Sequence, residues 1–402
     1  MLRYFIIIQC FLILLKIESS AQNEKLKKSS YYFELGEDAI KNKSYKKALA
    51  HFNECLRLEP FYWDAYYSRA IVRERLEDLK GALTDYNIFL ESKPDNAEAL
   101  FTRAVLRYQN GQWAVAREDF LKLMKMPSGE TNTIYFQLEK SGRASKVFTA
   151  QGEMRPTFLN HLALIDIKMN NYKRAISYLD SALYLLHDCG DCLINRGLAK
   201  QSARDTLGAL ADYKSALRID PENSLAMHNI ALLSDFGDMK EAEQLLTKAI
   251  DKNPTLPYSH SERGYLRLKN GNLKGALTDL TESIRLNPNE ADDWLNRGMV
   301  KEKLRDLPGA LADITNAIRI KSDFEKAWLC RGNIMSKSNR LKEAIEDYSV
   351  AIHHYPEYGL AFYNRALTYH KLGQLKEACA DLLEAQKLEI KVDSKVSEVI
   401  CK

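Results

Sequence analysis

One short motif in this sequence contains residues that could do chemistry. It is HDCGDC, in which Cys189 and Cys192 stand just before and just inside the start of a predicted helix. The N-terminus of a helix lowers the pKa of a nearby thiol, so the pair allows a redox or metal-linked role. A metal site would need further ligands, and a thioredoxin-like βαβ context is absent. The motif therefore favours a local disulfide or two spare thiols.

Arginine and aspartate also recur together, always 16 residues apart. The same pattern continues through three further stretches that lack both residues. There the corresponding residues are Leu35 with His51, Leu162 with Tyr178, and Ile230 with Leu245. Because the two residues come and go together, and would lie at matching levels on antiparallel helices, we predict a structural salt bridge within each helical hairpin. The pairs are Arg69 with Asp85, Arg103 with Asp119, Arg196 with Asp212, Arg263 with Asp279, Arg297 with Asp313, Arg331 with Asp347, and Arg365 with Asp381.

Both motifs belong to a unit of 34 residues that recurs along the chain. The stretch from Gly190 to Asn223 is predicted to form two amphipathic helices, and this template fits ten times. Position 8 of the unit is always glycine or alanine, as expected where two helices cross closely. Position 20 is always alanine: Ala48, Ala82, Ala116, Ala175, Ala209, Ala242, Ala276, Ala310, Ala344 and Ala378.

The period and the small residues resemble tetratricopeptide (TPR) repeats over residues 29–392, apart from one interruption. The resemblance implies an all-α fold, a right-handed superhelix (α-solenoid) of about ten helix-turn-helix repeats with a concave ligand groove. It does not name the ligand. With the export signal described next, the chain resembles exported TPR scaffold proteins of bacterial envelopes.

The ends and the interruption define the remaining segments. Residues 1–21 have a basic start, an apolar run from Tyr4 to Leu15 and a small-residue exit, which predicts a signal peptide cleaved after Ala21. At roughly 12 residues the run is shorter than the ~20 that span a bilayer, so we expect no transmembrane anchor in the mature chain. The other segments are a polar leader (22–28), repeats 1–3 (29–126), an insertion (127–155), repeats 4–10 (156–392) and a C-terminal capping helix (393–402).

The insertion between repeats 3 and 4 is predicted to be a β-hairpin. It contains two β-rich runs, TNTIYFQ and SKVFTAQ, on either side of a loop that includes glycine. Apolar and polar residues alternate in the first run, so one face should rest on the solenoid and the other should meet water. A tolerated insertion and a binding role by β-strand addition explain this segment equally well.

Six of the seven cysteines follow the predicted cleavage site, an even number for an exported chain in an oxidising setting. Cys379 and Cys401 are the first predicted disulfide, because Cys379 occupies a position that faces the next helix, here the cap. Cys189 and Cys192 are the second candidate pair. Cys55 and Cys330 are most simply packing residues.

The resemblance places the ligand groove on the first helix of each repeat, where positions 5 and 9 are largely apolar. We expect neighbouring turns to cover about half of these residues; the others suit an apolar peptide or helix as ligand. Position 13 is lysine in the last four repeats, which either complements helix carboxyl ends or binds acidic groups of the ligand. The predicted groove residues are Tyr67, Ile71, Phe101, Val105, Tyr108, Leu164, Ile194, Leu198, Leu232, Tyr265, Leu295, Met299, Tyr363, Leu367, Lys269, Lys303, Lys337 and Lys371.

We therefore predict an exported, non-enzymatic scaffold, periplasmic or secreted with a bacterial envelope favoured, that binds a protein or peptide. A formal net charge of +4 without a basic tract speaks against nucleic acid as partner, and no motif indicates a cofactor or a metal. Position 5 and position 9 of the first repeat are Phe33 and Glu37, not the Lys and Asn with which chaperone-tail TPR proteins hold a terminal carboxylate. Two alternatives stay open: a thiol-disulfide or metal-linked role at Cys189 and Cys192, and a lumenal co-chaperone-like protein without a J domain.

Overall fold

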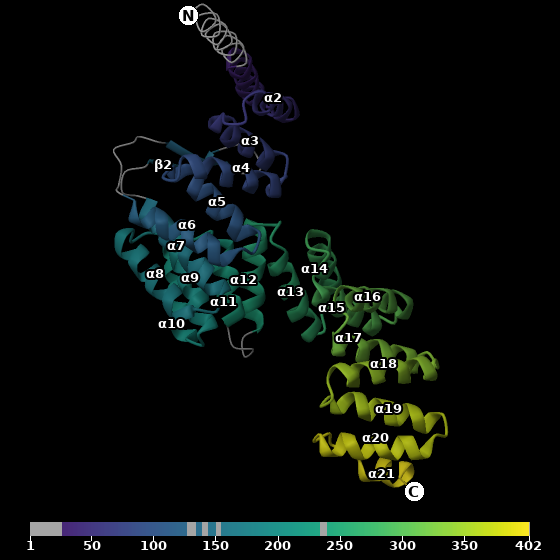
Figure 1. Cartoon of the computed structure of the whole chain (residues 1–402). Helices are drawn as coiled ribbons and strands as arrows, with labels where there is room; N and C mark the ends of the chain where they lie inside the picture. The colour runs from purple at the N-terminus through teal and green to yellow at the C-terminus, as the bar shows by residue number, and fades with distance from the viewer. Residues whose placement is uncertain (1–25, 127–133, 139–143, 150–153, 234–238, 402) are drawn as a thin grey trace, which may run out of the picture. The chain divides into compact units, whose positions relative to one another are not determined.

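The computed structural model describes residues 26–126, 134–138, 144–149, 154–233 and 239–401 (Figure 1). The predicted signal peptide, residues 1–21, lies outside this range. Contacts divide the chain into two compact units, Met1–Asp212 and Tyr213–Lys402. In both units, consecutive helices pair as antiparallel hairpins that follow the 34-residue period.

The first unit contains the described part of the first helix, residues 26–41, and the elements up to the start of α10. Its elements are α2 (Tyr45–Leu58), α3 (Trp63–Arg75), α4 (Leu79–Ser92), α5 (Ala97–Gln109), α6 (Trp113–Lys125), β1 (Ile134–Leu138), β2 (Ala144–Thr149), α7 (Met154–Lys168), α8 (Tyr172–Leu185), α9 (Gly190–Ser202) and α10 (Thr206–Ile219). The boundary with the second unit falls within α10.

The second unit continues the hairpins to the end of the chain. Its elements are α11 (Ser224–Leu233), α12 (Met239–Lys252), α13 (Pro257–Lys269), α14 (Leu273–Leu286), α15 (Ala291–Lys303), α16 (Leu307–Ile320), α17 (Glu325–Lys337), α18 (Leu341–His354), α19 (Gly359–Lys371), α20 (Leu375–Lys387) and α21 (Ser394–Ile400). No helix among the described residues of either unit has the length and apolar character needed to cross a bilayer.

The recurrent small residues lie where the two helices of a hairpin touch. All ten position-20 alanines are buried, with exposed fractions of at most 4%. At position 8, a methyl group built on Gly298 would lie 2.6 Å from Cγ1 of Ile314, and one built on Gly332 would lie 2.7 Å from Cε1 of Tyr348. The large residue at position 24 therefore occupies the space that a side chain at position 8 would need, so the prediction of close helix crossings is confirmed.

The turn inside each described hairpin depends on one residue with a left-handed backbone. Glycine provides it at Gly111, Gly271 and Gly373, where φ is 74°, 78° and 75°. The other hairpins use non-glycine residues at the same position 15, with φ between 54° and 66°: Lys43, Glu77, Asn170, Arg204, Arg305 and Asn339. Sequence analysis did not identify this position, because most of its residues are not the glycine that a positive φ usually indicates.

The insertion contains two short strands. Strand β1 pairs antiparallel with β2, from Ile134 opposite Thr149 to Leu138 opposite Ala144, with an irregularity between Gln137 and Leu138. The connection that would complete the predicted hairpin, residues 139–143, lies outside the described residues. So do the surroundings of the strands' side chains, and the predicted inner and outer faces therefore stay predictions.

Helix α21 covers the apolar end of the last hairpin. Its Ile400 is buried in a cluster with Ala366, Ala378 and Leu382. A disulfide between Cys379 of α20 and Cys401 fastens this cap, with a sulfur–sulfur distance of 2.09 Å. A terminal repeat in a solenoid needs such a cover because its outer face would otherwise leave apolar residues in water.

We predict that Gly298→Ala lowers the free energy of unfolding by about 1–3 kcal/mol, because the new methyl group would overlap Ile314. Urea unfolding of the full chain, followed by circular dichroism, measures this change. The control is Gly190→Ala, since nothing lies within 4 Å of a methyl group at Gly190. Equal midpoints for the two variants would show that the crossing at position 8 is not tight.

Candidate functional site

The structure joins all seven predicted arginine–aspartate pairs. In each, Nε and Nη2 of the arginine donate to the two carboxylate oxygens, at distances between 2.7 and 3.0 Å. The aspartates are buried, with exposed fractions from 0% at Asp85 to 7% at Asp381. This planar arrangement satisfies both oxygens of a carboxylate that has been removed from water.

Five of the seven aspartates hold a second cation that sequence analysis missed. It comes from position 11, four residues after the first arginine on the same helix. The second cations lie 2.7 to 2.9 Å from the carboxylates: Arg73 on Asp85, Arg107 on Asp119, Lys200 on Asp212, Arg267 on Asp279 and Lys301 on Asp313. Asp347 and Asp381 have Met335 and Tyr369 at position 11, so among the described residues each has one cation.

The same arginines also reach back to the preceding repeat. In six repeats, Nη1 donates to a polar side chain at position 25 of the hairpin before, at 2.7 to 3.4 Å. The acceptors are Asn53, Asn87, Asp180, Thr247, Thr281 and Ser349. Each of these arginines therefore ties two consecutive hairpins together, and its donors are too fully used for it to serve as a site for a ligand's anion.

The fourth repeat has Leu162 and Tyr178 in place of the arginine–aspartate pair. It contains another salt bridge, in which the acidic residue lies on the first helix and the basic residue on the second. Its carboxylate, Asp166, lies on the first helix and is fully buried. Arg174 of α8 binds it through Nε and Nη2 at 2.5 Å each. Nε of Arg117, on α6, lies 3.7 Å from the same carboxylate, which links the helices on either side of the insertion.

Replacing Arg331 by leucine should cost about 3–5 kcal/mol of unfolding free energy, because Asp347 would be left as an unpaired buried charge. Replacing Arg297 by leucine should cost less than half as much, since Nζ of Lys301 stays 2.8 Å from Asp313. Urea denaturation of both variants makes the comparison. Equal losses of unfolding free energy in the two variants would mean that Lys301 does not compensate for the missing arginine at Asp313.

The predicted groove residues differ in how far they face solvent. Leu198 and Leu232 are exposed, and the lysines Lys269, Lys303, Lys337 and Lys371 are exposed as well. Ten apolar members are half-buried: Tyr67, Ile71, Phe101, Val105, Tyr108, Leu164, Tyr265, Met299, Tyr363 and Leu367.

Two predicted groove residues are wrong. Ile194 and Leu295 have exposed fractions of 7% and 1%, so a ligand cannot contact them. Leu295 packs in a cluster with Ala310, Ile314 and Ala327, so in this repeat the side chain at position 5 belongs to the core. Sequence alone does not reveal this, because a leucine suits a groove wall and a core equally well.

The four lysines of the last repeats are not equivalent. Nζ of Lys337 lies 2.5 Å from Oε1 of Glu302, and Nζ of Lys269 lies over the ring of Tyr265 at 5.4 Å. Within the described part of the chain, Lys303 and Lys371 have no carboxylate within ion-pair distance. Of the four lysines, these two therefore remain available to bind a ligand.

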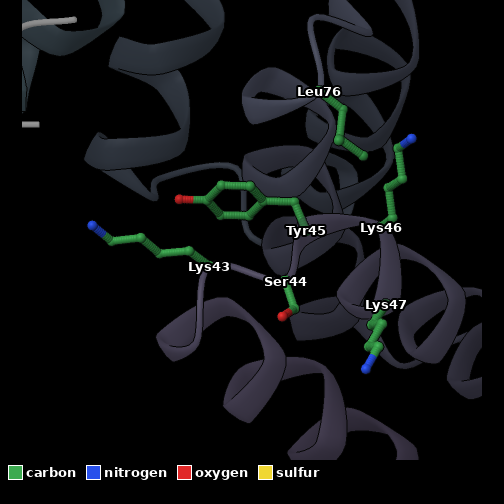
Figure 2. A pocket seen from close by; sticks show the side chains of 6 residues that line it. All are labelled: Lys43, Ser44, Tyr45, Lys46, Lys47 and Leu76. Atoms are coloured by element: carbon green, nitrogen blue, oxygen red, sulfur yellow. The ribbon is translucent and has the colours of Figure 1, made fainter. Parts of the chain in front are cut away.

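The two cavities described for the chain are not lined by predicted groove residues. One of about 350 Å³ is lined by Lys43, Ser44, Tyr45, Lys46, Lys47 and Leu76. Figure 2 shows that its three lysine side chains point away from one another, so they do not converge on a single anion. Another, of about 340 Å³, is lined by Asn87, Leu90, Glu91, Pro94, Leu100, Arg103, Arg107 and Lys122, several of which already serve the salt bridges.

The remaining cysteines separate into a second disulfide and two free thiols. Cys189 and Cys192 are bonded, with a sulfur–sulfur distance of 2.01 Å. Cys55 and Cys330 are free, and burial raises the pKa of each thiol to about 11. No group of three or more possible metal ligands occurs among the described residues.

A buried histidine in the second unit makes stability depend on pH. His228 of α11 is buried, its Nδ1 lies 3.2 Å from Oγ of Ser259, and burial lowers its pKa to about 4. In the unfolded chain the same group has a pKa of about 6.5, so between these values the unfolded state binds more protons. The contribution of neutral His228 to the stability of the folded state is therefore complete above pH 6.5 and is lost as the pH falls toward 4.

We expect the wild-type chain to lose about 3 kcal/mol more than His228→Gln when the pH is lowered from 7 to 4, because glutamine cannot be protonated. Urea unfolding across this range gives both curves, and the difference cancels the titration of carboxylates common to the two proteins. Parallel curves would contradict the low pKa.

The repeated helical hairpins and their buried salt bridges define an all-α repeat protein, an α-solenoid. Residues 35–107 and residues 360–389 each match the tetratricopeptide repeat family. The chain therefore contains tetratricopeptide repeats in these two stretches, and TPR arrays generally mediate binding between proteins.

The chain is similar in sequence to parts of two larger proteins with different names. DnaJ homolog subfamily C member 3 of Rattus norvegicus is 27% identical over 209 residues, which cover 50% of this chain and 38% of the relative. Protein O-mannosyl-transferase TMTC3 of Homo sapiens is 26% identical over 255 residues, covering 59% of this chain and 28% of the relative. The chain thus spans less than half of either relative, and the transferase activity in the second name is not carried over.

Solved structures show the same fold. A chain in the crystal structure of the APC/C hetero-tetramer Cut9-Hcn1 aligns with a TM-score of 0.50 and 12% identity, over 93% of this chain and 96% of that one. At this identity the likeness concerns the fold alone.

Proposed function

We propose that this protein is a non-enzymatic scaffold that binds an extended peptide or a helix of a partner protein on the first helices of its hairpins. The observation that carries the proposal is the contrast between two sets of charges in the second unit. The arginines at position 7 are occupied by buried aspartates, whereas Lys303 and Lys371 are exposed without an ion pair in the described structure.

Apolar side chains lie on the same helices as these lysines. Met299 precedes Lys303 by one helical turn on α15, and Leu367 precedes Lys371 by one turn on α19; both are half-buried. Residues four apart share a helix face. A ligand that pairs an apolar group with a carboxylate about one turn away would meet both partners on either helix, which supports the predicted acidic and apolar character.

We further propose that the chain is exported, with cleavage after Ala21. The two disulfides support this, because disulfides persist mainly in oxidising compartments. Mass spectrometry of the protein from its native cells would then show Gln22 as the first residue, while an intact Met1 would contradict export by cleavage. This proposal includes a periplasmic location of the protein in a bacterial envelope.

The likeness to DnaJ homolog subfamily C member 3 supports a second candidate, a co-chaperone-like protein that holds partly folded chains. The sequence contains no His-Pro-Asp triplet, so this candidate has no J-domain signature of its own. The two candidates differ in the ligand they require: a defined partner for the scaffold, and many unfolded chains for the co-chaperone.

The groove is tested by placing a photo-crosslinking amino acid at Leu367 and, as a control, at the exposed Leu207 on another helix. We expect a discrete crosslinked partner at position 367 and none at position 207. Lys303→Glu with Lys371→Glu should weaken that crosslink at least fivefold, because the acidic groups of the ligand would be repelled, whereas Lys376→Glu on α20 should not. A crosslink of unchanged yield in the charge-reversed variant would contradict the proposal.

A further inference from the structure

The connection between α8 and α9 departs from the repeat pattern in several places at once. In eight other repeats position 29 is charged: Arg57, Glu91, Lys125, Arg218, Asp251, Arg285, Arg319 and Lys387. Here it is Tyr184, with an exposed fraction of 80%, followed by Leu185 and Leu186, with 51% and 44%. Three consecutive apolar side chains therefore face solvent directly before the HDCGDC motif. Packing within the repeat does not explain Tyr184, because equivalent hairpins are stable with a charged residue at its position.

The disulfide beside this apolar patch has one accessible and one buried sulfur. Cys189 is the N-cap of α9 and is half-buried. Cys192 occupies position 3, which is alanine in five other repeats, and is 1% exposed in a cluster with Leu159, Ala163 and Ala199. A thiolate arriving from solvent would therefore attack Cys189, and Cys192 would be the leaving group.

The start of α9 is suited to hold Cys189 as a thiolate after the bond opens. The backbone N–H of Cys192 already donates to Sγ of Cys189, at 3.2 Å. Unpaired N–H groups and the helix dipole stabilise negative charge at this end of a helix. The neighbouring carboxylates of Asp188 and Asp191 act against it, whereas the hydrogen bond acts on the sulfur directly.

A purely structural role explains this disulfide less well than the other one. Cys379 and Cys401 are 22 residues apart and join the cap to the last hairpin. Cys189 and Cys192 are 3 residues apart, within the first turn of a helix that other repeats form without a disulfide. Closing so short a loop restricts the unfolded chain much less, so the bond contributes correspondingly less to stability.

We propose that Cys189 and Cys192 form a thiol–disulfide exchange site, which oxidises a pair of cysteines in a partly folded protein segment held against Tyr184, Leu185 and Leu186. The apolar patch selects this occupant, since buried side chains of a folded partner are accessible only while its chain is incompletely folded. The inference does not rest on the groove.

The reaction consists of two exchanges. A substrate thiolate attacks Sγ of Cys189, the bond between Cys189 and Cys192 breaks, and the electron pair leaves on Sγ of Cys192, which takes a proton from water. The second substrate thiolate then attacks the substrate sulfur of the mixed disulfide and releases the Cys189 thiolate. Two electrons pass from the substrate dithiol to this chain, so one substrate disulfide forms for each Cys189–Cys192 bond that is reduced.

The test uses the oxidised full-length chain and one equivalent of a reduced synthetic peptide with two cysteines flanked by leucine and phenylalanine, without oxygen. Alkylation and mass spectrometry follow the thiols of both molecules. We expect the peptide to become oxidised as Cys189 and Cys192 become reduced, at least tenfold faster than with the double variant Cys189→Ser and Cys192→Ser. The double variant Cys379→Ser and Cys401→Ser should react as the wild type does.

Four single variants test which sulfur is attacked first and whether the apolar patch binds the peptide. Cys192→Ser leaves the Cys189 thiol, which should trap the oxidised peptide as a mixed disulfide at least tenfold faster than Cys189→Ser traps it through Cys192. Tyr184→Ser should slow peptide oxidation at least threefold relative to Leu207→Ser, whose side chain is equally exposed, at 82%, on another helix. A peptide that stays reduced, a wild type no faster than the Cys189→Ser and Cys192→Ser variant, or trapping mainly through Cys192 would overturn the exchange site. Equal rates for Tyr184→Ser and Leu207→Ser would overturn the role of the patch.

Discussion

The structure of this chain depends on buried carboxylates that are held by arginine across seven of its helical hairpins. A single buried charge is costly in a protein interior, whereas a carboxylate with both oxygens occupied by one planar guanidinium is tolerated. The bidentate geometry requires the arginine and the aspartate to lie at the same level along two antiparallel helices that pack closely. The alanine at position 20 and the small residue at position 8 permit that approach. The salt bridge and the close crossing therefore require the same arrangement of the two helices, and seven repeats combine both.

The arginines also explain how one hairpin is placed on the next. In six of the seven arginines the third nitrogen reaches a polar side chain at position 25 of the preceding repeat, so the residue that closes a hairpin also sets the register of its neighbour. In a solenoid, stability is carried by such contacts between nearest neighbours. The fourth repeat keeps this principle with the charges reversed, through Asp166 and Arg174, next to the insertion. The exposed apolar patch and the second disulfide lie at the far end of that same repeat, where the pattern has been relaxed.

Sequence analysis predicted the parts of the fold that repeat. The hairpins, the alanine crossings and the seven salt bridges follow from residues that recur at fixed spacing, and both disulfides follow from cysteines placed against a neighbouring element or a helix start. The second cation at position 11 was missed because it changes between arginine and lysine and is absent from two repeats. The left-handed residue at position 15 was missed because lysine, glutamate and arginine do not indicate a positive φ. Ile194 and Leu295 were misplaced because their burial depends on how the next hairpin packs, which one repeat does not encode.

A double-mutant cycle on Arg331 and Asp347, with leucine at either position and at both, measures in urea unfolding of the full chain how strongly the two side chains depend on each other. The account predicts that the double variant stays within about 1 kcal/mol of the wild type although each single change is strongly destabilising, since two apolar side chains leave no buried charge behind. Additive losses, with a coupling energy below about 0.5 kcal/mol, would show that the two side chains act independently and would contradict the account.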